Sequence, residues 1–150
     1  MSPETGTTDQ RGWTVAGFSH GGTSAVQFGS AHPELLGSFL AMSPQVAPST
    51  RPVTDTIRTG SRRDRAAYNR ASPLSVVRAR TPSSSMCASL ALGATDARHD
   101  AQPPVLAAAA IAAGVTAGVH LVPHGAHDRH TAAAGLARGL GTLVPVWGAR

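Results

Sequence analysis

Apolar and polar positions alternate along the chain in blocks whose lengths predict strands and helices in turn. Apolar blocks of strand length lie at Trp13–Phe18, Leu35–Met42, Met86–Leu92 and Val115–Val122. Longer blocks predict helices at Thr23–Ala31, Pro104–Ala113 and Thr131–Leu140. Strands that alternate with helices at this spacing form right-handed crossover units, so the predicted fold class is α/β, a mostly parallel sheet with helices on both faces.

The remaining segments set the expected domain organisation. Residues 1–10 are polar and are predicted to be a disordered N-terminal tail, followed by a single domain over residues 11–150. Residues 45–85 are rich in arginine, proline and serine, which predicts a long insertion with one helix at Ser61–Arg70.

The amino-acid composition excludes several classes of protein and of site. The hydrophobic fraction of 41% is enough for a core, and a charged fraction of 14% is low for an acidic tail or a coiled coil. The single cysteine, Cys87, excludes an intramolecular disulfide and a cysteine-built zinc site. The first ten residues have neither a basic start nor an apolar stretch, so we expect no secretory signal there, and localisation stays open.

The most lipid-like segment is Val105–Val122, which carries no formal charge. Its length is that of a membrane span, but it is rich in alanine and is interrupted by Gly114, Gly118 and His120. We therefore expect a buried helix followed by a buried strand, and no membrane span.

The net charge of +5 is concentrated in one part of the chain. All 13 basic residues are arginines, and seven of them fall between Arg58 and Arg80. A basic patch can bind nucleic acid or an acidic partner, but this one has only Tyr68 as an interleaved aromatic residue and no DNA-binding motif. We expect a solvated insertion and no nucleic-acid partner, with an acidic partner as the alternative.

The segment Gly17-Phe-Ser-His-Gly21 matches the G-x-S-x-G pattern. It lies between a predicted strand and a predicted helix, the context in which this pattern forms a sharp turn that exposes Ser19 as a nucleophile. Residues two positions from the serine are expected to lack side chains so that Ser19 can project. The backbone N–H of His20, at the start of the helix, is the expected donor to a developing oxyanion.

A serine nucleophile needs a base, and the base needs a carboxylate that fixes its tautomer. Asp96 follows the third predicted strand and His127 follows the fourth, which gives the order Ser, Asp, His seen in α/β-hydrolases. Asp100 is an alternative to Asp96 as the acid. Because sites in such sheets lie beyond the carboxyl ends of the strands, we expect Ser19, Asp96 and His127 to meet there.

Four histidines close together, His120, His124, His127 and His130, raise the alternative of a metal site. Pro123 and Gly125 interrupt any helix that would align them. We expect His127 to act as a base beside three unrelated histidines, with no bound metal and no cofactor.

Several longer segments resemble the bacterial putative-esterase family, which includes feruloyl esterases and mycolyltransferases. The segments are Trp13–Phe28, Ala31–Phe39, Met42–Pro44, Ala67–Leu74, Gly93–Asp96, Ala112–Val115 and Val122–Asp128. The resemblance covers about Arg11 to Leu143 and implies an α/β-hydrolase fold with Ser19 as nucleophile, Asp96 as acid and His127 as base. It implies an ester of a small molecule or a glycan as substrate.

The chain resembles only the C-terminal portion of such proteins. Family members carry further strands before the serine turn and a second oxyanion donor on an early loop, so we expect a partial domain that lacks the N-terminal strands. The strand at Trp13–Phe18 would then be an exposed edge that favours pairing into a homo-oligomer. The expected function is a serine ester hydrolase with an acyl-enzyme intermediate. The alternatives are an acyltransferase to a sugar hydroxyl and an inactive fragment.

Overall fold

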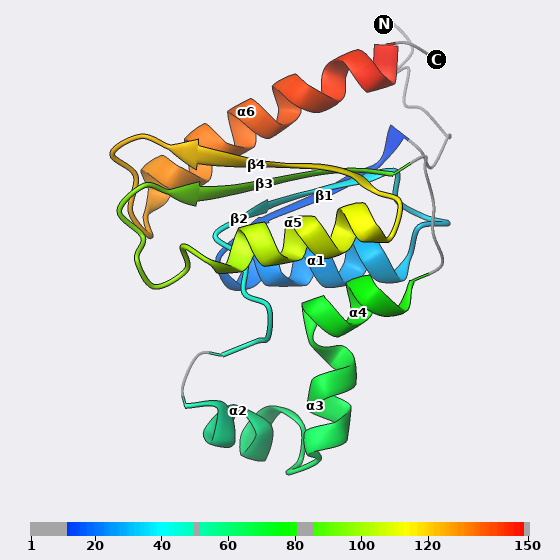
Figure 1. The fold of residues 1–150 in the computed structure, drawn as a ribbon, viewed down its shortest axis with the longest axis vertical. Coiled ribbons are helices and arrows are strands. Elements are labelled where there is room, and N and C mark those ends of the chain that lie inside the picture. Colours follow the sequence, from blue (N-terminus) through cyan, green and yellow to red (C-terminus); the bar gives the residue numbers. More distant parts are fainter. Residues whose placement is uncertain (1–11, 50–51, 81–85, 149–150) are drawn as a thin grey trace, which may run out of the picture.

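A computed structural model describes residues 12–49, 52–80 and 86–148 and shows one parallel sheet between helices (Figure 1). The strands are β1 (Thr14–Phe18), β2 (Ser38–Met42), β3 (Cys87–Gly93) and β4 (Thr116–Val122). The helices are α1 (His20–Ala31), α2 (Val53–Gly60), α3 (Arg65–Ala71), α4 (Pro73–Ala79), α5 (Gln102–Ala112) and α6 (Arg129–Gly148). The predicted α/β class with a parallel sheet is therefore confirmed.

All neighbouring strands are parallel, in the order β1-β2-β3-β4. Figure 1 shows α1 and α5 on one face of the sheet and α6 on the other, as predicted. Among the described residues β1 pairs with β2 alone, so its far side is an open edge. Parallel strands end at the same side of a sheet, and the segments that follow β1, β3 and β4 therefore meet there.

The core has two halves because β2 is buried on both faces. Phe39 and Ala41 belong to the half between the sheet and helices α1, α4 and α5. Leu40 and Met42 belong to the half that α6 covers. Consecutive side chains of a strand point to opposite faces, so a continuous apolar run marks a strand covered on both sides.

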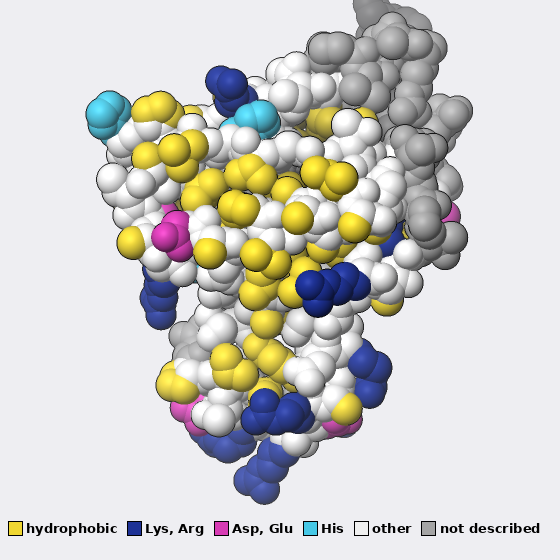
Figure 2. Space-filling view, in the orientation of Figure 1, with side chains coloured by type: hydrophobic (Ala, Val, Ile, Leu, Met, Phe, Trp, Pro, Cys, Tyr) yellow, Lys and Arg dark blue, Asp and Glu magenta, His cyan; other side chains and the backbone are white. Residues whose placement is uncertain are grey.

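The segment 45–85 differs from the prediction. One helix was expected at Ser61–Arg70; α3 covers only part of that range, and α2 and α4 were not predicted. Both extra helices are short, and α4 is stabilised by packing on α1 and α5 rather than by its own sequence. The described arginines of this segment are exposed except Arg80, and Figure 2 shows arginine side chains around the lobe that α2 and α3 form.

The helix predicted at Thr131–Leu140 is longer than expected, because α6 runs from Arg129 to Gly148. The lipid-like segment divides into α5 and β4 at Gly114, whose φ of 81° ends the helix in a conformation that suits glycine. Over the described ranges, no helix combines the length and hydropathy that a membrane span requires. The expected tail at residues 1–10 lies outside the described residues.

The surface over α5 and β4 is unusually apolar. Figure 2 shows hydrophobic side chains gathered on this face. The exposed large apolar residues of α5 are Val105 and Ile111, and those of β4 are Val119 and Leu121. A cavity of about 540 Å³ lies at its margin, lined by Arg78, Arg80 and small side chains of α5. None of the predicted site residues lines this cavity.

Candidate active site

The turn at Ser19 has the sharp geometry that its sequence predicted. Ser19 has φ 56° and ψ −117°, a region that residues with a side chain rarely occupy. Its N–H donates to the carbonyl of Met42 at the end of β2, at 2.8 Å. Ser19 precedes α1, but its hydroxyl does not cap the helix, so it remains free to bond elsewhere.

The glycine requirement of this turn is only partly as predicted. A Cβ on Gly17 would collide with the backbone of Gly21, so Gly17 must lack a side chain. A Cβ on Gly21 itself would meet nothing within 4 Å, and the expectation for that position is wrong. The second required glycine is Gly22, where a Cβ would lie 2.7 Å from the carbonyl oxygen of Met42.

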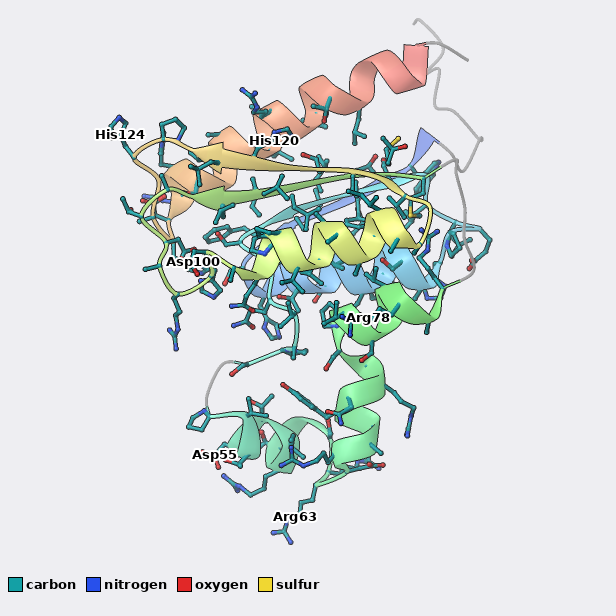
Figure 3. The ribbon with its side chains drawn as sticks, in the orientation of Figure 1. Asp55, Arg63, Arg78, Asp100, His120 and His124 are labelled. Atoms are coloured by element: carbon teal, nitrogen blue, oxygen red, sulfur yellow. The ribbon has the colours of Figure 1, made fainter. Side chains whose placement is uncertain are left out.

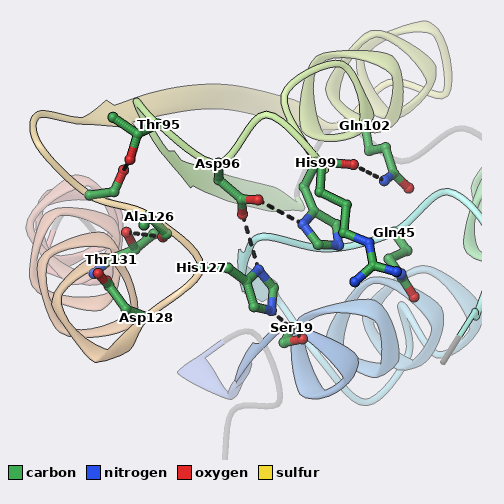
Figure 4. A network of polar contacts seen from close by, with 12 residues as sticks. Ser19, Gln45, Thr95, Asp96, His99, Gln102, Ala126, His127, Asp128 and Thr131 are labelled. Atoms are coloured by element: carbon green, nitrogen blue, oxygen red, sulfur yellow. Dashed lines mark hydrogen bonds and ion pairs between the residues drawn. The ribbon is translucent and has the colours of Figure 1, made fainter.

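A continuous chain of hydrogen bonds links the three predicted residues (Figure 4). His127 Nε2 lies 2.7 Å from the Ser19 hydroxyl, and His127 Nδ1 lies 3.0 Å from Asp96 Oδ2. An ionised carboxylate only accepts hydrogen bonds, so Nδ1 carries the proton and Nε2 accepts from the serine hydroxyl. This is the arrangement in which His127 can take a proton from Ser19.

Asp96 is buried, with 5% of its surface exposed. Burial by itself raises its pKa, but hydrogen bonds from His99 and His127 and the charge of His99 outweigh burial, so the pKa of Asp96 is lowered. The Ser43 hydroxyl adds to the lowering, although it makes no hydrogen bond of ordinary geometry. Asp96 is therefore an anion in the neutral pH range.

His99 is part of this network, and the sequence reasoning missed it. Its Nδ1 lies 2.9 Å from Asp96 Oδ1, and its ring stacks on that of His127 with centroids 4.5 Å apart. The ring of Phe18 also lies near that of His127, with centroids 4.8 Å apart. The only available signal was a second polar side chain three residues after Asp96, in the same turn.

The alternative acid lies apart from the histidine. The carboxylate of Asp100 is exposed and accepts a hydrogen bond from the N–H of Ala101 at 2.7 Å. His20 has an exposed side chain, while its N–H lies in the first turn of α1, next to Ser19. The described structure thus brings Asp96 against His127 and leaves Asp100 as a local turn residue.

The four clustered histidines do not assemble. His120 Nδ1 bonds to Arg138 at 3.3 Å, and its pKa is lowered by burial and then by that arginine. Figure 3 shows His120 on β4 beside α6 and His124 at the outer end of the following loop.

Within the described ranges, the group whose donor atoms are close enough for a metal is Asp96, His99 and His127, within 4.8 Å of one another. Both Nδ1 atoms of that group already bond to Asp96.

Comparisons with known proteins agree with this fold. A family model described as "Putative esterase" matches residues 3–142. An uncharacterized protein of Corynebacterium glutamicum is 54% identical over 41 residues, which are 27% of this chain and 10% of that protein.

Solved structures are more distant in sequence. A ferulic acid esterase is 20% identical with a TM-score of 0.68, over 87% of this chain and 50% of the other. The capsule O-acetyltransferase of Neisseria meningitidis serogroup A is 19% identical with a TM-score of 0.68, over 94% and 59%. An S-formylglutathione hydrolase from Agrobacterium tumefaciens is 23% identical with a TM-score of 0.62, over 80% and 44%.

The chain thus spans about half the length of these solved structures. At such identities the likeness shows a shared fold. The family match covers nearly the whole chain, residues 3–142. This chain belongs to the Putative esterase family and has its α/β-hydrolase-like fold.

Proposed function

We propose that this chain is a carboxylic ester hydrolase in which Ser19 is the nucleophile, His127 the general base and Asp96 the residue that orients His127. The observation that supports this most directly is the hydrogen-bond chain from Ser19 through His127 to Asp96, at 2.7 and 3.0 Å. In this proposal the nucleophile Ser19 has a base within hydrogen-bond distance, and that base has a carboxylate within hydrogen-bond distance of its other nitrogen.

The proposed reaction has two halves. Nε2 of His127 takes the hydroxyl proton while Oγ of Ser19 bonds to the ester carbonyl carbon. When the tetrahedral intermediate collapses, His127 gives this proton to the departing alcohol and leaves an acyl group on Ser19. Water then attacks the acyl carbon, His127 accepts its proton, and the proton returns to Oγ as the carboxylic acid leaves.

The start of α1 supplies part of the electrostatic stabilisation in this proposal. The N–H of His20 and the positive end of the helix dipole both lie at Ser19, where the intermediate carries its negative charge. Burial of Asp96 strengthens its attraction for the imidazolium form of His127, because the local dielectric is low.

Hydrolysis of p-nitrophenyl acetate and butyrate tests the proposal. We expect Ser19→Ala and His127→Ala to lower kcat by about 10⁴-fold or more, as losses of triad members do. Ser24→Ala is the matched control, since its hydroxyl donates to the backbone carbonyl of His20, at 3.1 Å. A fluorophosphonate probe should label the wild-type protein and not Ser19→Ala. A folded wild-type protein with no rate above Ser19→Ala would identify an inactive family member.

Acyl transfer to a sugar hydroxyl is the second candidate. It is favoured by the structural likeness to a capsule O-acetyltransferase, which extends over 94% of this chain. Both activities share the acyl-Ser19 intermediate and differ in what attacks it. Sugars added to the p-nitrophenyl acetate assay separate the two activities, because a transferase forms an acetylated sugar that mass spectrometry detects.

A further inference from the structure

His99 is a buried histidine to which the proposed mechanism assigns no role. It is 5% exposed and lies in the turn after β3, three residues beyond Asp96. Its backbone N–H bonds to the carbonyl of Asp96 at 3.0 Å, and its carbonyl accepts from the N–H of Gln102 at the start of α5. The turn therefore holds the His99 backbone on both sides before any side-chain contact forms.

The side chain of His99 completes the surroundings of Asp96. His99 Nδ1 faces one carboxylate oxygen and His127 Nδ1 faces the other, at 2.9 and 3.0 Å (Figure 4). A carboxylate that bonds at one oxygen only can rotate about its last side-chain bond, whereas two donors, one at each oxygen, hold its plane. Asp96 Oδ2 is held on His127 in this way.

His99 also contacts the base directly. Its ring stacks on that of His127 at an angle of 24°, while Phe18 lies against His127 at an angle of 36°. The imidazole of His127 thus contacts two rings and has both nitrogens engaged. Its freedom to turn away from Ser19 is limited by His99 through the stack and through the shared carboxylate.

We propose that His99 is a positioning residue for the reaction at Ser19. It donates from Nδ1 to Asp96 and supports the ring of His127, which keeps the acid and the base aligned. The inference rests on the proposed function, and it adds a fourth residue to the three that the sequence indicated.

Two substitutions of His99 distinguish the effect of its hydrogen bond to Asp96 from the effect of its ring packing on His127. His99→Asn keeps a donor near the position of Nδ1 and removes the stacked ring, whereas His99→Phe keeps a ring and removes the donor. We expect His99→Phe to lower kcat by about 10-fold to 100-fold with little change in KM, as displaced supporting residues do. We expect His99→Asn to retain more of the wild-type kcat than His99→Phe, because it keeps the donor to Asp96 and loses only the stacked ring. His120→Phe is the matched control, since His120 bonds to Arg138 and lies outside the network.

The pH profile adds a readout that a purely structural role would leave unchanged. Without the donor, Asp96 binds its proton more strongly and attracts the imidazolium of His127 more strongly. The acidic limb of kcat/KM should therefore move to higher pH in His99→Phe and stay in place in His99→Asn. Equal losses of rate in both variants, with no movement of the limb, would overturn the proposal.

Imidazole nitrogen NMR tests the contact without turnover. In Ser19→Ala, which retains His99, the neutral imidazoles of both His99 and His127 should be the tautomer that carries its proton on Nδ1. A proton on Nε2 of His99 in the folded protein would refute the proposal, whether or not the protein hydrolyses esters. Absence of Ser19-dependent hydrolysis in the wild type would instead refute the proposed function, so the two failures are distinguishable.

Discussion

Gly93 and Gly125 pack backbone against backbone at the ends of β3 and β4. A Cβ on Gly93 would lie 2.5 Å from the carbonyl carbon and oxygen of Gly125. The carbonyl of Gly125 also accepts a hydrogen bond from the N–H of Thr95, at 2.8 Å. Through this contact, the turn that holds Asp96 and the loop that holds His127 form one unit, and the distance between the two side chains depends on it.

Gly93→Ala should therefore separate Asp96 from His127. The added methyl group forces the two backbones apart, which costs about 1–3 kcal/mol of stability and lowers kcat by about 10²-fold. Gly118→Ala on β4 is the control, because a Cβ there meets nothing within 4 Å. The two variants are compared by urea denaturation and by ester hydrolysis. Similar behaviour of the two would contradict the role of this contact.

The two glycines of the G-x-S-x-G pattern should respond differently to substitution. Gly17→Ala places a methyl group against the backbone of Gly21 and should disrupt the turn at Ser19, abolishing activity and lowering the melting temperature. Gly21→Ala enters open space in the first turn of α1 and should be tolerated, with a gain of up to about 1 kcal/mol from helix propensity. Loss of activity in Gly21→Ala at unchanged melting temperature would show that residue 21 has a role in the reaction itself.

Asp96→Asn should be far more damaging to activity than Asp100→Asn. The amide group that replaces the Asp96 carboxylate would donate to Nδ1 of His127, which places the ring proton on Nε2. A protonated Nε2 cannot accept the hydroxyl proton of Ser19. Such a change costs about 10⁴-fold in kcat in a serine protease triad. The carboxylate of Asp100 bonds to the N–H of Ala101, and its replacement should leave kcat within a small factor of wild type. A greater loss in Asp100→Asn would reverse the assignment.

The lowered pKa of Asp96 predicts how stability depends on pH. A carboxyl group with a lower pKa in the folded state stabilises the fold above its unfolded value, near 3.8, and this stabilisation disappears as the pH falls through the folded value. Urea denaturation between pH 7 and pH 3 should show a smaller fall in unfolding free energy for Asp96→Asn than for wild type. Glu34 and Asp128 also have lowered pKa values, so part of the dependence should persist in the variant.

The open edge of β1 predicts self-association. Ala16 is exposed at the centre of this strand, and edge strands without charged side chains tend to pair with other chains. Light scattering coupled to size-exclusion chromatography should show oligomers that Ala16→Lys weakens. Leu121→Glu is the comparison, since Leu121 lies on β4, at the opposite edge. Oligomers that only Leu121→Glu disrupts would place the interface on β4 instead.

Much of the fold was predictable because its signals are local. The strand predicted at Leu35–Met42 contains β2, and the helix predicted at Thr23–Ala31 lies within α1. Both predictions follow from apolar runs that end at the breaks His32-Pro33 and Ser43-Pro44. The short helices α2 and α4 were not predictable in this way, because seven or eight residues cannot form a stable helix alone. Packing of α4 on α1 and α5 supplies what its sequence lacks.

The sequence by itself determined the order of the elements, the sharp turn at Ser19, and the placing of a serine, an acid and a histidine after three strands. Only the tertiary structure decided that Asp96 rather than Asp100 meets His127, and that His99 joins them. Periodicity and turn residues act within a few positions of the chain. The distances that relate Ser19 to His127 arise from the register of parallel strands and the packing of two loops, and such contacts exist only once the sheet has formed.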